Sequence, residues 1–491
     1  MKINLEDYKR KLLMEISSPG RLGTTLPEMD VPKSELPDKG IIRQSLNFPE
    51  VSESQLVRYF ANLSQLNFSI DTNFYPLGSC TMKYNPKLHD EIASLPGFAN
   101  IHPLQQEESV QGALKIMYEL QILLSEITGM NATSLAPLAG AEGELAGMLM
   151  IRQYHLSNGD VNRTKVLIPD SAHGTNPASA KMAGFEVITL KSDNEGNTDL
   201  SDLENNLNEE LAAVMLTIPS TLGIFDPNIV EICEKVHDSG GMVYGDGANL
   251  NALLGKVKLG EIGVDVIHSN LHKTFSTPHG GGGPGAGPVM VNKKLERFLP
   301  SPIIIKTKDS NTQSFYKINT PPNSIGKMGA FHGNFGVLLR AYVYISLLGK
   351  DGIAKISEDA VLNANYILNA LKNVLDLPYD RTCMHEVVFS ARNFKKKYGI
   401  TALDIAKRLI DYGIHPPTMY FPLIVDEALM IEPTETETKD TLDYFIDVIK
   451  TIEEEASNNP DIIHSAPHNA GNTRLDEAKA ARDPDLSFKL D

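Results

Sequence analysis

The stretch His268-Ser269-Asn270-Leu271-His272-Lys273-Thr274-Phe275 follows a short apolar run, Val264–Ile267, and precedes a glycine-rich segment from Gly280 to Gly287. The apolar run has the composition of a buried strand, which places Lys273 in a loop at the carboxyl end of that strand. Open α/β sheets bind their ligands at this edge. The glycines leave the next loop without side chains, so backbone can approach a flat ligand closely. Lys273 is then either a Schiff-base nucleophile or a solvated surface lysine, and the stretch alone favours the surface lysine.

The composition is that of a globular protein with an acidic balance. The chain has 491 residues, of which 42% are hydrophobic, and its net charge is −17. This length suffices for two or three domains. The negative charge argues against a protein that wraps nucleic acid or lies on an anionic membrane. An anionic ligand therefore needs a local positive field, such as that of a helix N-terminus.

The cysteines and the termini indicate an intracellular setting. Cys80, Cys233 and Cys383 are the three cysteines, and their wide spacing predicts neither a disulfide framework nor a metal site. The first residues lack the apolar core of a signal peptide, and no stretch approaches the roughly 20 apolar residues of a membrane helix. We therefore expect a soluble cytoplasmic protein with no metal.

Apolar segments alternate with helices in the middle of the chain. A helix predicted over 110–127 ends at Gly129, and further helices are expected over 140–155, 177–183 and 228–238. This alternation predicts an α/β fold with a mostly parallel sheet that is covered on both faces. The apolar run 134–138 precedes the expected strands, which are 165–168, 186–190, 212–218, 242–244, 264–267 and 288–291.

The patterning divides the chain into four parts. Residues 1–103 read as an N-terminal arm and loop layer, of the kind that commonly lies across a partner subunit, and 104–336 are expected to form the large domain. A smaller C-terminal α+β domain is expected over 337–456, with a helix that ends at Gly349 and an irregular tail over 457–491. The elements predicted in the small domain are helices over 353–373, 402–412 and 439–455 and strands over 386–389 and 428–431.

Two polar side chains stand at the ends of expected strands. Asp246, close to the small residue Ala248, is either a partner for a protonated ring nitrogen or a helix N-cap. His173 either stacks on a flat heterocycle or is a capping, partly buried histidine. Taken one at a time, each of these residues favours the structural alternative.

A possible phosphate cradle and a pair of hydroxyls stand at two further strand ends. In Gly140-Ala141-Glu142-Gly143, free backbone N–H groups and the helix dipole suit a phosphate, although such turns are common without a ligand. The absence of a GK[ST] ending argues against an ATP or GTP site. Ser220 and Thr221 either reach a ring substituent or form an ordinary turn.

The evidence for a functional site is stronger when these groups are considered together. The carboxyl ends of parallel strands share one edge of a sheet, so the cradle, the histidine, the carboxylate and the lysine are expected to converge. A phosphate-bearing pyridine aldehyde requires this set of groups. The sequence therefore predicts a site for pyridoxal 5′-phosphate.

Five motifs stand out beyond the single residues: Asn270 to Phe275, Pro278 to Gly285, Tyr75 to Lys83, Phe331 to Gly336 and Leu429 to Glu435. They resemble the P-protein family of the glycine cleavage system, and the similarity extends from about residue 73 to 467. The resemblance implies a PLP-dependent transferase fold of type I, with a mostly parallel sheet of the seven-stranded type. It also implies glycine dehydrogenase (decarboxylating) activity, in which glycine loses CO2 and its aminomethyl group passes to the lipoyl arm of H-protein.

The length implies a particular form of that family. Single-chain members are about twice as long, and this chain resembles the lysine-bearing half, which is called subunit 2 in two-subunit members. The resemblance thus implies a homologous subunit 1 without the lysine, and an α2β2 assembly. Glu142 departs from the family pattern, in which glutamine is expected.

The resemblance also implies roles for individual residues. Lys273 holds the cofactor covalently, Asp246 pairs with its ring nitrogen and His173 stacks on its ring. Asn270 and His272 contact phosphate or substrate. The residues expected near the substrate carboxylate are Ser79, Cys80 and Thr81, although Cys80 is equally readable as a small buried hydrophobe.

Two other functions remain open from the sequence. One is another lyase or decarboxylase of the same fold, acting for example on glutamate or cysteine. The other is a non-catalytic subunit that kept the fold, and the joint presence of Lys273, Asp246 and His173 weighs against it.

Overall fold

The computed structural model describes residues 11–35, 40–43, 46–281, 283–308 and 313–487. The first ten residues of the expected arm, Gly282 of the glycine run and the last four residues of the tail lie outside this description. The chain forms two compact units, one of Met1–Asn73 with Ala470–Thr473, the other of Phe74–Asn469 with Arg474–Asp491. The predicted domain boundaries after residues 103, 336 and 456 remain predictions.

The first unit contains one long helix, α2 (Glu53–Gln65). It begins with a capping box, because the Ser52 hydroxyl accepts the N–H of Gln55 and the Gln55 side chain accepts the N–H of Ser52. None of its side chains is buried. Burial of an apolar face within its own unit therefore does not account for the stability of this helix.

The second unit is built on a seven-stranded sheet, as the sequence predicts. Its strand order is β1-β7-β6-β5-β4-β2-β3, and β7 runs antiparallel to β1 and to β6 while the other pairs are parallel. All six expected strands are present, and the run 134–138 contributes only its first residue to β1. The strands are β1 Ala132–Ser134, β2 Lys165–Pro169, β3 Glu186–Leu190, β4 Leu211–Thr217, β5 Met242–Asp246, β6 Val266–His268 and β7 Val289–Val291.

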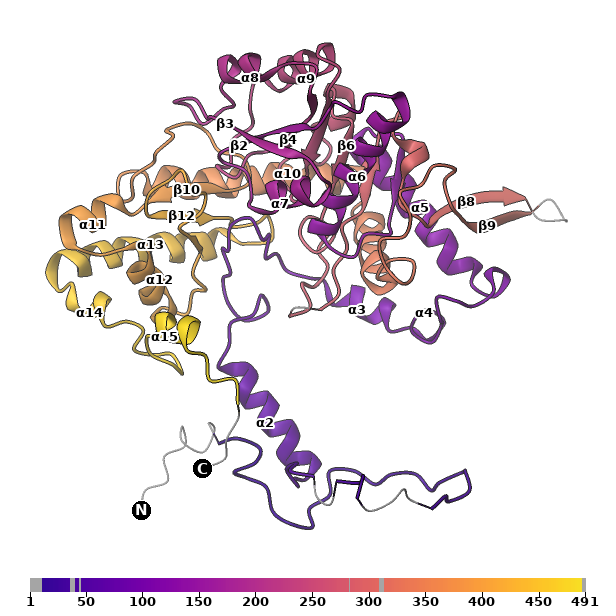
Figure 1. The fold of residues 1–491 in the computed structure, drawn as a ribbon. Coiled ribbons are helices and arrows are strands. Elements are labelled where there is room, and N and C mark those ends of the chain that lie inside the picture. Colours follow the sequence, from indigo (N-terminus) through magenta and orange to yellow (C-terminus); the bar gives the residue numbers. More distant parts are fainter. Residues whose placement is uncertain (1–10, 36–39, 44–45, 282, 309–312, 488–491) are drawn as a thin grey trace. The chain divides into compact units, whose positions relative to one another are not determined.

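Alternate residues of each strand face two different cores. Leu167, Val214 and Ile267 belong to one apolar cluster, whereas their neighbours Val166 and Met215 belong to another. The first cluster packs against α5 (Gln111–Thr128), α9 (Ile229–Asp238) and α10 (Phe335–Leu371), and the second against α6 (Gly140–Asn158) and α7 (Thr175–Met182). Figure 1 shows the sheet among these helices. Burial of both faces explains the continuous apolar runs that marked the strands.

Glycine allows α6 to approach the sheet closely. A Cβ at Gly147 would lie 2.5 Å from the Tyr244 ring, so only glycine fits at this crossing. This contact fixes the amino end of α6 at the carboxyl edge of the sheet. Shorter helices of the same unit are α3 Lys87–Ala93, α4 Pro96–Ala99, η1 Glu107–Ser109, α8 Leu200–Asn206, η2 Leu259–Ile262 and η3 Glu296–Phe298.

The small C-terminal region has the expected α+β composition. Helix α10 is broken at Gly349, whose φ of 60° and ψ of −171° are not helical, so it comprises the two helices that the sequence predicts. Strands β10, β12 and β11 form an antiparallel sheet in that order. The elements are β10 Val387–Ser390, α11 Arg392–Tyr398, α12 Ala402–Asp411, β11 Thr418–Met419, β12 Ala428–Ile431 and α13 Lys439–Asn458.

Two features differ from the expectation. Strands β8 (Ile303–Lys308) and β9 (Ser314–Asn319) form an antiparallel hairpin that the sequence analysis did not predict. The amide of Gln121 anchors it to α5, because its Oε1 accepts the Ile304 N–H and its Nε2 donates to the Ile304 carbonyl. The tail predicted to be irregular contains short helices, α14 (Asp461–His464) and α15 (Glu477–Arg482).

Among the described residues, no helix is long and apolar enough to span a bilayer.

The segment from Phe74 to Lys83 is bound to the small sheet. The Gly78 N–H donates to the Met430 carbonyl at 3.3 Å, and the Glu432 N–H donates to the Pro76 carbonyl at 3.2 Å. The Thr418 hydroxyl donates to the Gly78 carbonyl at 2.8 Å. The segment thus lies along β12 with backbone groups satisfied, which holds the following turn in place.

Substitution of Gly78 by alanine should destabilise this attachment. The new Cβ would meet the backbone of Met430, with its carbonyl oxygen only 2.6 Å away, so the segment must shift. We expect a loss of about 1–3 kcal/mol in the free energy of unfolding, measured by urea titration. Gly112→Ala is the matched control, since nothing lies within 4 Å of its Cβ and alanine suits the helix. An equal stability of both variants would contradict the prediction.

Candidate functional site

A cavity of about 160 Å³ opens at the carboxyl edge of the large sheet. It borders Asp246 at the end of β5, Lys273 in the loop after β6, His173 ahead of α7 and Gly140 at the start of α6. The structure therefore brings together the four groups that the sequence placed at separate strand ends. The other lining residues are Ser79, Ala141, Glu144, Thr175, Thr217, Pro219, Thr221, Ala248, Asn249, Asn270, His385 and Glu386.

Asp246 is a buried carboxylate whose environment favours the charged form. Its oxygens accept the Ala248 N–H at 3.0 Å and the Asn176 Nδ2–H at 2.9 Å, and His268 Nε2 lies 3.7 Å away. Burial alone would raise the pKa of this carboxyl, but His268 and the two hydrogen bonds outweigh it and hold the pKa below its usual value. Asp246 is thus suited to hold a proton on a ring nitrogen.

A polar network behind Asp246 was not anticipated from the sequence. The Tyr244 hydroxyl lies 2.5 Å from His268 Nδ1, and both side chains are fully buried. Asn176 Nδ2 donates to Asp246 and also, at 3.1 Å, to Glu144. Burial and the neighbouring Asp246 raise the pKa of Glu144 to about 7. The sequence did contain one indication of this network: Glu144 is an acidic residue among the alanines and methionines of α6.

His173 borders the cavity with an exposed ring. Its Nδ1 lies 2.8 Å from the Thr175 hydroxyl, and the ring packs edge-on against Phe421 with centroids 5.6 Å apart. Surrounding protein atoms nevertheless desolvate the imidazole and lower its pKa. A neutral, oriented ring beside the cavity is compatible with stacking on a planar ligand.

The amino end of α6 has the features of an anion cradle. Gly140 and Ala141 border the cavity, and a Cβ at Gly140 would lie 2.6 Å from Asn270 Nδ2, so backbone and amide approach closely there. The buried Asn270 Oδ1 has no hydrogen-bond partner among the described residues. The carboxylate of Glu142 accepts the N–H of Leu138 and is not among the lining residues. Helix N–H groups therefore remain to bind phosphate.

Other predicted residues are distributed more widely. Thr221 borders the cavity, and its hydroxyl donates to the Ser171 carbonyl, whereas Ser220 lines a neighbouring cavity of about 30 Å³. His272 is outside the lining residues and packs against His279 with ring centroids 5.2 Å apart. Burial lowers the pKa of His272 to about 4. Direct contact of His272 and Ser220 with a ligand remains a prediction.

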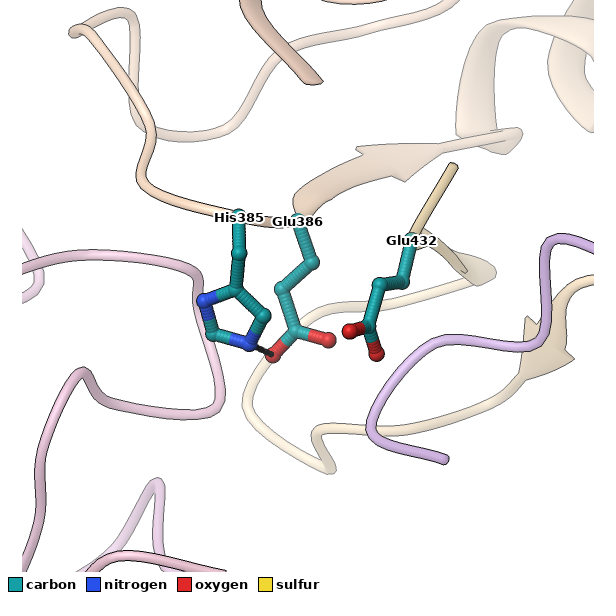
Figure 2. Close-up of side chains that lie close together, drawn as sticks. All are labelled: His385, Glu386 and Glu432. Carbon is teal, nitrogen blue, oxygen red and sulfur yellow. Dashed lines mark ion pairs between the residues drawn. The ribbon is translucent and has the colours of Figure 1, made fainter. Parts of the chain in front are cut away.

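The turn Ser79-Cys80-Thr81 is held by two glutamates that adjoin the strands β10 and β12 of the small sheet. The Ser79 N–H donates to Glu386 at 2.7 Å, and the Thr81 N–H donates to Glu432 at 3.0 Å. Ser79 borders the cavity, and Cys80 is half-buried, with burial raising the pKa of its thiol. Figure 2 shows the two carboxyl groups side by side with His385. The sequence analysis missed both glutamates as site residues, although each adjoins a buried strand.

The raised pKa of Glu144 predicts a pH effect on stability. Because this pKa is about 7 in the folded chain and near 4.5 ordinarily, the stabilisation present below pH 4.5 is lost as pH rises through 7. Glu144→Gln removes this titration. Between pH 5 and 8 the free energy of unfolding should therefore decrease less in the variant than in the unchanged chain, by about 1–3 kcal/mol. Urea titrations at both pH values measure this, with the exposed Glu209→Gln as control. If the unchanged chain and both variants showed the same pH dependence of stability, the raised pKa of Glu144 would be refuted.

Two family comparisons match the chain. The family described as "Glycine dehydrogenase, C-terminal domain" matches residues 356–473, and "Aminotransferase class-V" matches residues 150–407. Among solved structures, the crystal structure of a glycine decarboxylase (P-protein) in inhibitor-bound form has a TM-score of 0.72 at 19% identity and covers 84% of this chain and 93% of its own. The structure of Oryza sativa TDC with PLP and tryptamine has a TM-score of 0.65 at 13% identity, covering 85% and 90%. These likenesses confirm the predicted type I fold.

Full-length relatives are much more similar in sequence. A Listeria welshimeri protein named "Probable glycine dehydrogenase (decarboxylating) subunit 2" is 53% identical over 491 residues, which cover 99% of both chains. A Bacillus cytotoxicus protein of the same name is 54% identical over 489 residues, again with 99% of each chain covered. The resemblance inferred from the motifs is confirmed: the chain belongs to the family of glycine dehydrogenase (decarboxylating) subunit 2.

Proposed function

We propose that the chain is the cofactor-bearing subunit of a glycine decarboxylase and works with pyridoxal phosphate held on Lys273. The supporting observation is the convergence of Lys273, Asp246 and His173 on one cavity, in a chain more than half identical to its relatives over its full length. The reaction is the decarboxylation of glycine followed by transfer of its aminomethyl group.

The residues around the cavity fit this cofactor. The α6 N-terminus and the side-chain Nδ2–H of Asn270, which lines the cavity, suit a phosphate, and Asp246 lies in the same cavity as a partner for a ring nitrogen. Bound there, pyridoxal phosphate supplies an electron sink for the electrons that remain on the glycine Cα when CO2 leaves. Asp246 would hold a proton on the ring nitrogen, and His173 would stack on one face of the ring. Lys273 Nζ provides the covalent attachment.

The second half of the reaction requires a disulfide acceptor. The electron pair left on Cα forms a bond to one sulfur of a lipoyl group, the S–S bond breaks, and the other sulfur takes up a proton. We propose a lipoylated H-protein as the carrier of this group. The family name "subunit 2" supports a subunit 1 as a further partner. We propose that this subunit is homologous and that the two form an α2β2 assembly.

Exchange of labelled bicarbonate into the carboxyl group of glycine tests this function. We expect exchange when the chain is combined with pyridoxal phosphate, subunit 1 and lipoylated H-protein, because decarboxylation is then reversible. Omission of subunit 1 should reduce the rate about 100-fold or more, since the proposed assembly is incomplete. No exchange in the full mixture would refute the reaction, and full activity of this chain alone would refute the heteromeric assembly. Decarboxylation that needs no lipoylated partner would indicate another decarboxylase of this fold.

Lys273→Ala tests the attachment of the cofactor. We expect the variant to lose the visible absorbance of bound pyridoxal phosphate after dialysis, because no amine remains at this position to bond the aldehyde. Bicarbonate exchange should fall to background. Lys256→Ala, at an exposed position of the same domain, should keep both the colour and the exchange. Colour that persists in the Lys273 variant would mean that another lysine holds the cofactor.

A further inference from the structure

Glu386, which precedes β10, borders the cavity of Lys273. The residue is 3% exposed, and Glu432 is fully buried. Glu386, Glu432 and His385 each have a side-chain oxygen or nitrogen within 4.8 Å of those of the other two. Figure 2 shows the three side chains close together. Two buried carboxyl groups this close favour a state in which they share one proton, as in the carboxyl pairs of acid proteases.

The hydrogen bonds indicate which glutamate carries the proton. Glu432 accepts on both oxygens, from Asn249 Nδ2 at 2.8 Å and from the Thr81 N–H at 3.0 Å. Glu386 accepts the Ser79 N–H on Oε2, whereas no hydrogen bond among the described residues reaches its Oε1. Donors stabilise the ionised form, so the charge resides on Glu432 and the proton on Glu386 Oε1.

The electrostatic surroundings agree with this distribution. Burial and the neighbouring Glu432 raise the pKa of Glu386 well above its usual value, while burial raises that of Glu432 to about 7. The other titratable groups that face Glu386 are Lys273, His385, Cys80 and Cys383. Burial lowers the pKa of His385 to about 3 and raises that of Cys383 to about 12, so neither changes charge between pH 6.5 and 10.

The cavity offers few cations to a substrate carboxylate. Among the described residues that line it, Lys273 is the only lysine or arginine. Once Lys273 holds the cofactor, a carboxylate that enters must find another donor. A neutral carboxylic acid meets this need, because an O–H donor forms short, strong hydrogen bonds to a carboxylate.

Resting on the proposed function, we propose that Glu386, in its neutral acid form, binds the carboxylate of glycine through a hydrogen bond from Oε1–H. Ionised Glu432 keeps the proton on Glu386, and the same pair of side chains holds the turn that bears Ser79. A neutral donor binds the glycine carboxylate without the strong ion pair that would stabilise it against departure as CO2.

The ratio of glycine affinity to methylamine affinity isolates this contact. Methylamine is glycine without the carboxylate, and each affinity is corrected for the ionisation of the ligand's own amine, because the two amines have different pKa values. Both are titrated into the holoenzyme, with subunit 1 present, while the absorbance of the bound cofactor is followed between pH 6.5 and 10. We expect the ratio to fall as pH rises through the raised pKa of Glu386, because the O–H donor is lost above it.

Two substitutions of Glu386 separate the donor from its charge. The amide of Glu386→Gln still accepts from Ser79 and still donates an N–H at every pH, so the alkaline fall of the ratio should disappear. Glu386→Met removes the donor and should lower glycine affinity about 10- to 100-fold while leaving methylamine affinity unchanged. Glu437→Gln is the matched control, since burial raises the pKa of that carboxyl to about 7 as well, but it is not among the residues that line the cavity.

Glu432→Gln provides an independent test should the Glu386 variants fold poorly. Loss of the neighbouring negative charge lowers the pKa of Glu386, so the fall of the ratio should move to lower pH. An alkaline fall that persists in Glu386→Gln, an equal loss of methylamine affinity in Glu386→Met, or an unmoved fall in Glu432→Gln would overturn the proposal. Absence of bicarbonate exchange by the unchanged enzyme would instead refute the proposed reaction, so the two failures are distinguishable.

Discussion

A buried ammonium group joins the parts of the molecule that form the cavity. Lys83 Nζ donates to Glu435 at 2.6 Å, to Asn251 at 2.8 Å and to Tyr344 at 3.2 Å, and the lysine side chain is almost fully buried. Such a charge is stable in the interior only when its partners are all in place. These partners lie after β5, on α10 and after β12, so a single side chain requires both sheets to be assembled around the segment that precedes it.

The cavity also reconciles an acidic chain with an anionic ligand. The net charge is −17, yet the edge of the sheet presents the amino end of α6, Lys273 and several amide groups. The carboxylates nearby are held by donors or by a proton, which limits their repulsion of a phosphate. Local fields therefore decide what binds, whereas the overall charge concerns association with large anionic partners.

The sequence predicted the elements whose burial pattern is local. Runs such as Val264–Ile267 are apolar because both faces of the sheet are covered. Gly129 and Gly349 mark real helix ends because glycine readily adopts positive φ. The hairpin β8–β9 escaped prediction because the apolar run of its first strand, Ile303–Ile305, is only three residues long and is followed by polar residues without alternation. The placement of Lys273, Asp246 and His173 was predictable because Asp246 ends β5 and the other two follow the carboxyl ends of β6 and β2, which are parallel strands of one sheet. The roles of Glu386 and Glu432 were not predictable, because they depend on contacts with distant residues of one turn. Glu386 contacts Ser79, 307 residues earlier, and Glu432 contacts Thr81, 351 residues earlier.

The turn at Ser79 and Thr81 has a consequence for the order in which the protein forms. Both residues have positive φ, 67° and 52°, a conformation that costs a non-glycine residue of the order of 1–3 kcal/mol. The carboxylates that accept their N–H groups come from the last quarter of the sequence. During synthesis, this turn is made early but receives its acceptors only after residue 432 has left the ribosome. The substrate side of the cavity is therefore completed last, and a truncated chain would keep Lys273 and Asp246 but not this wall.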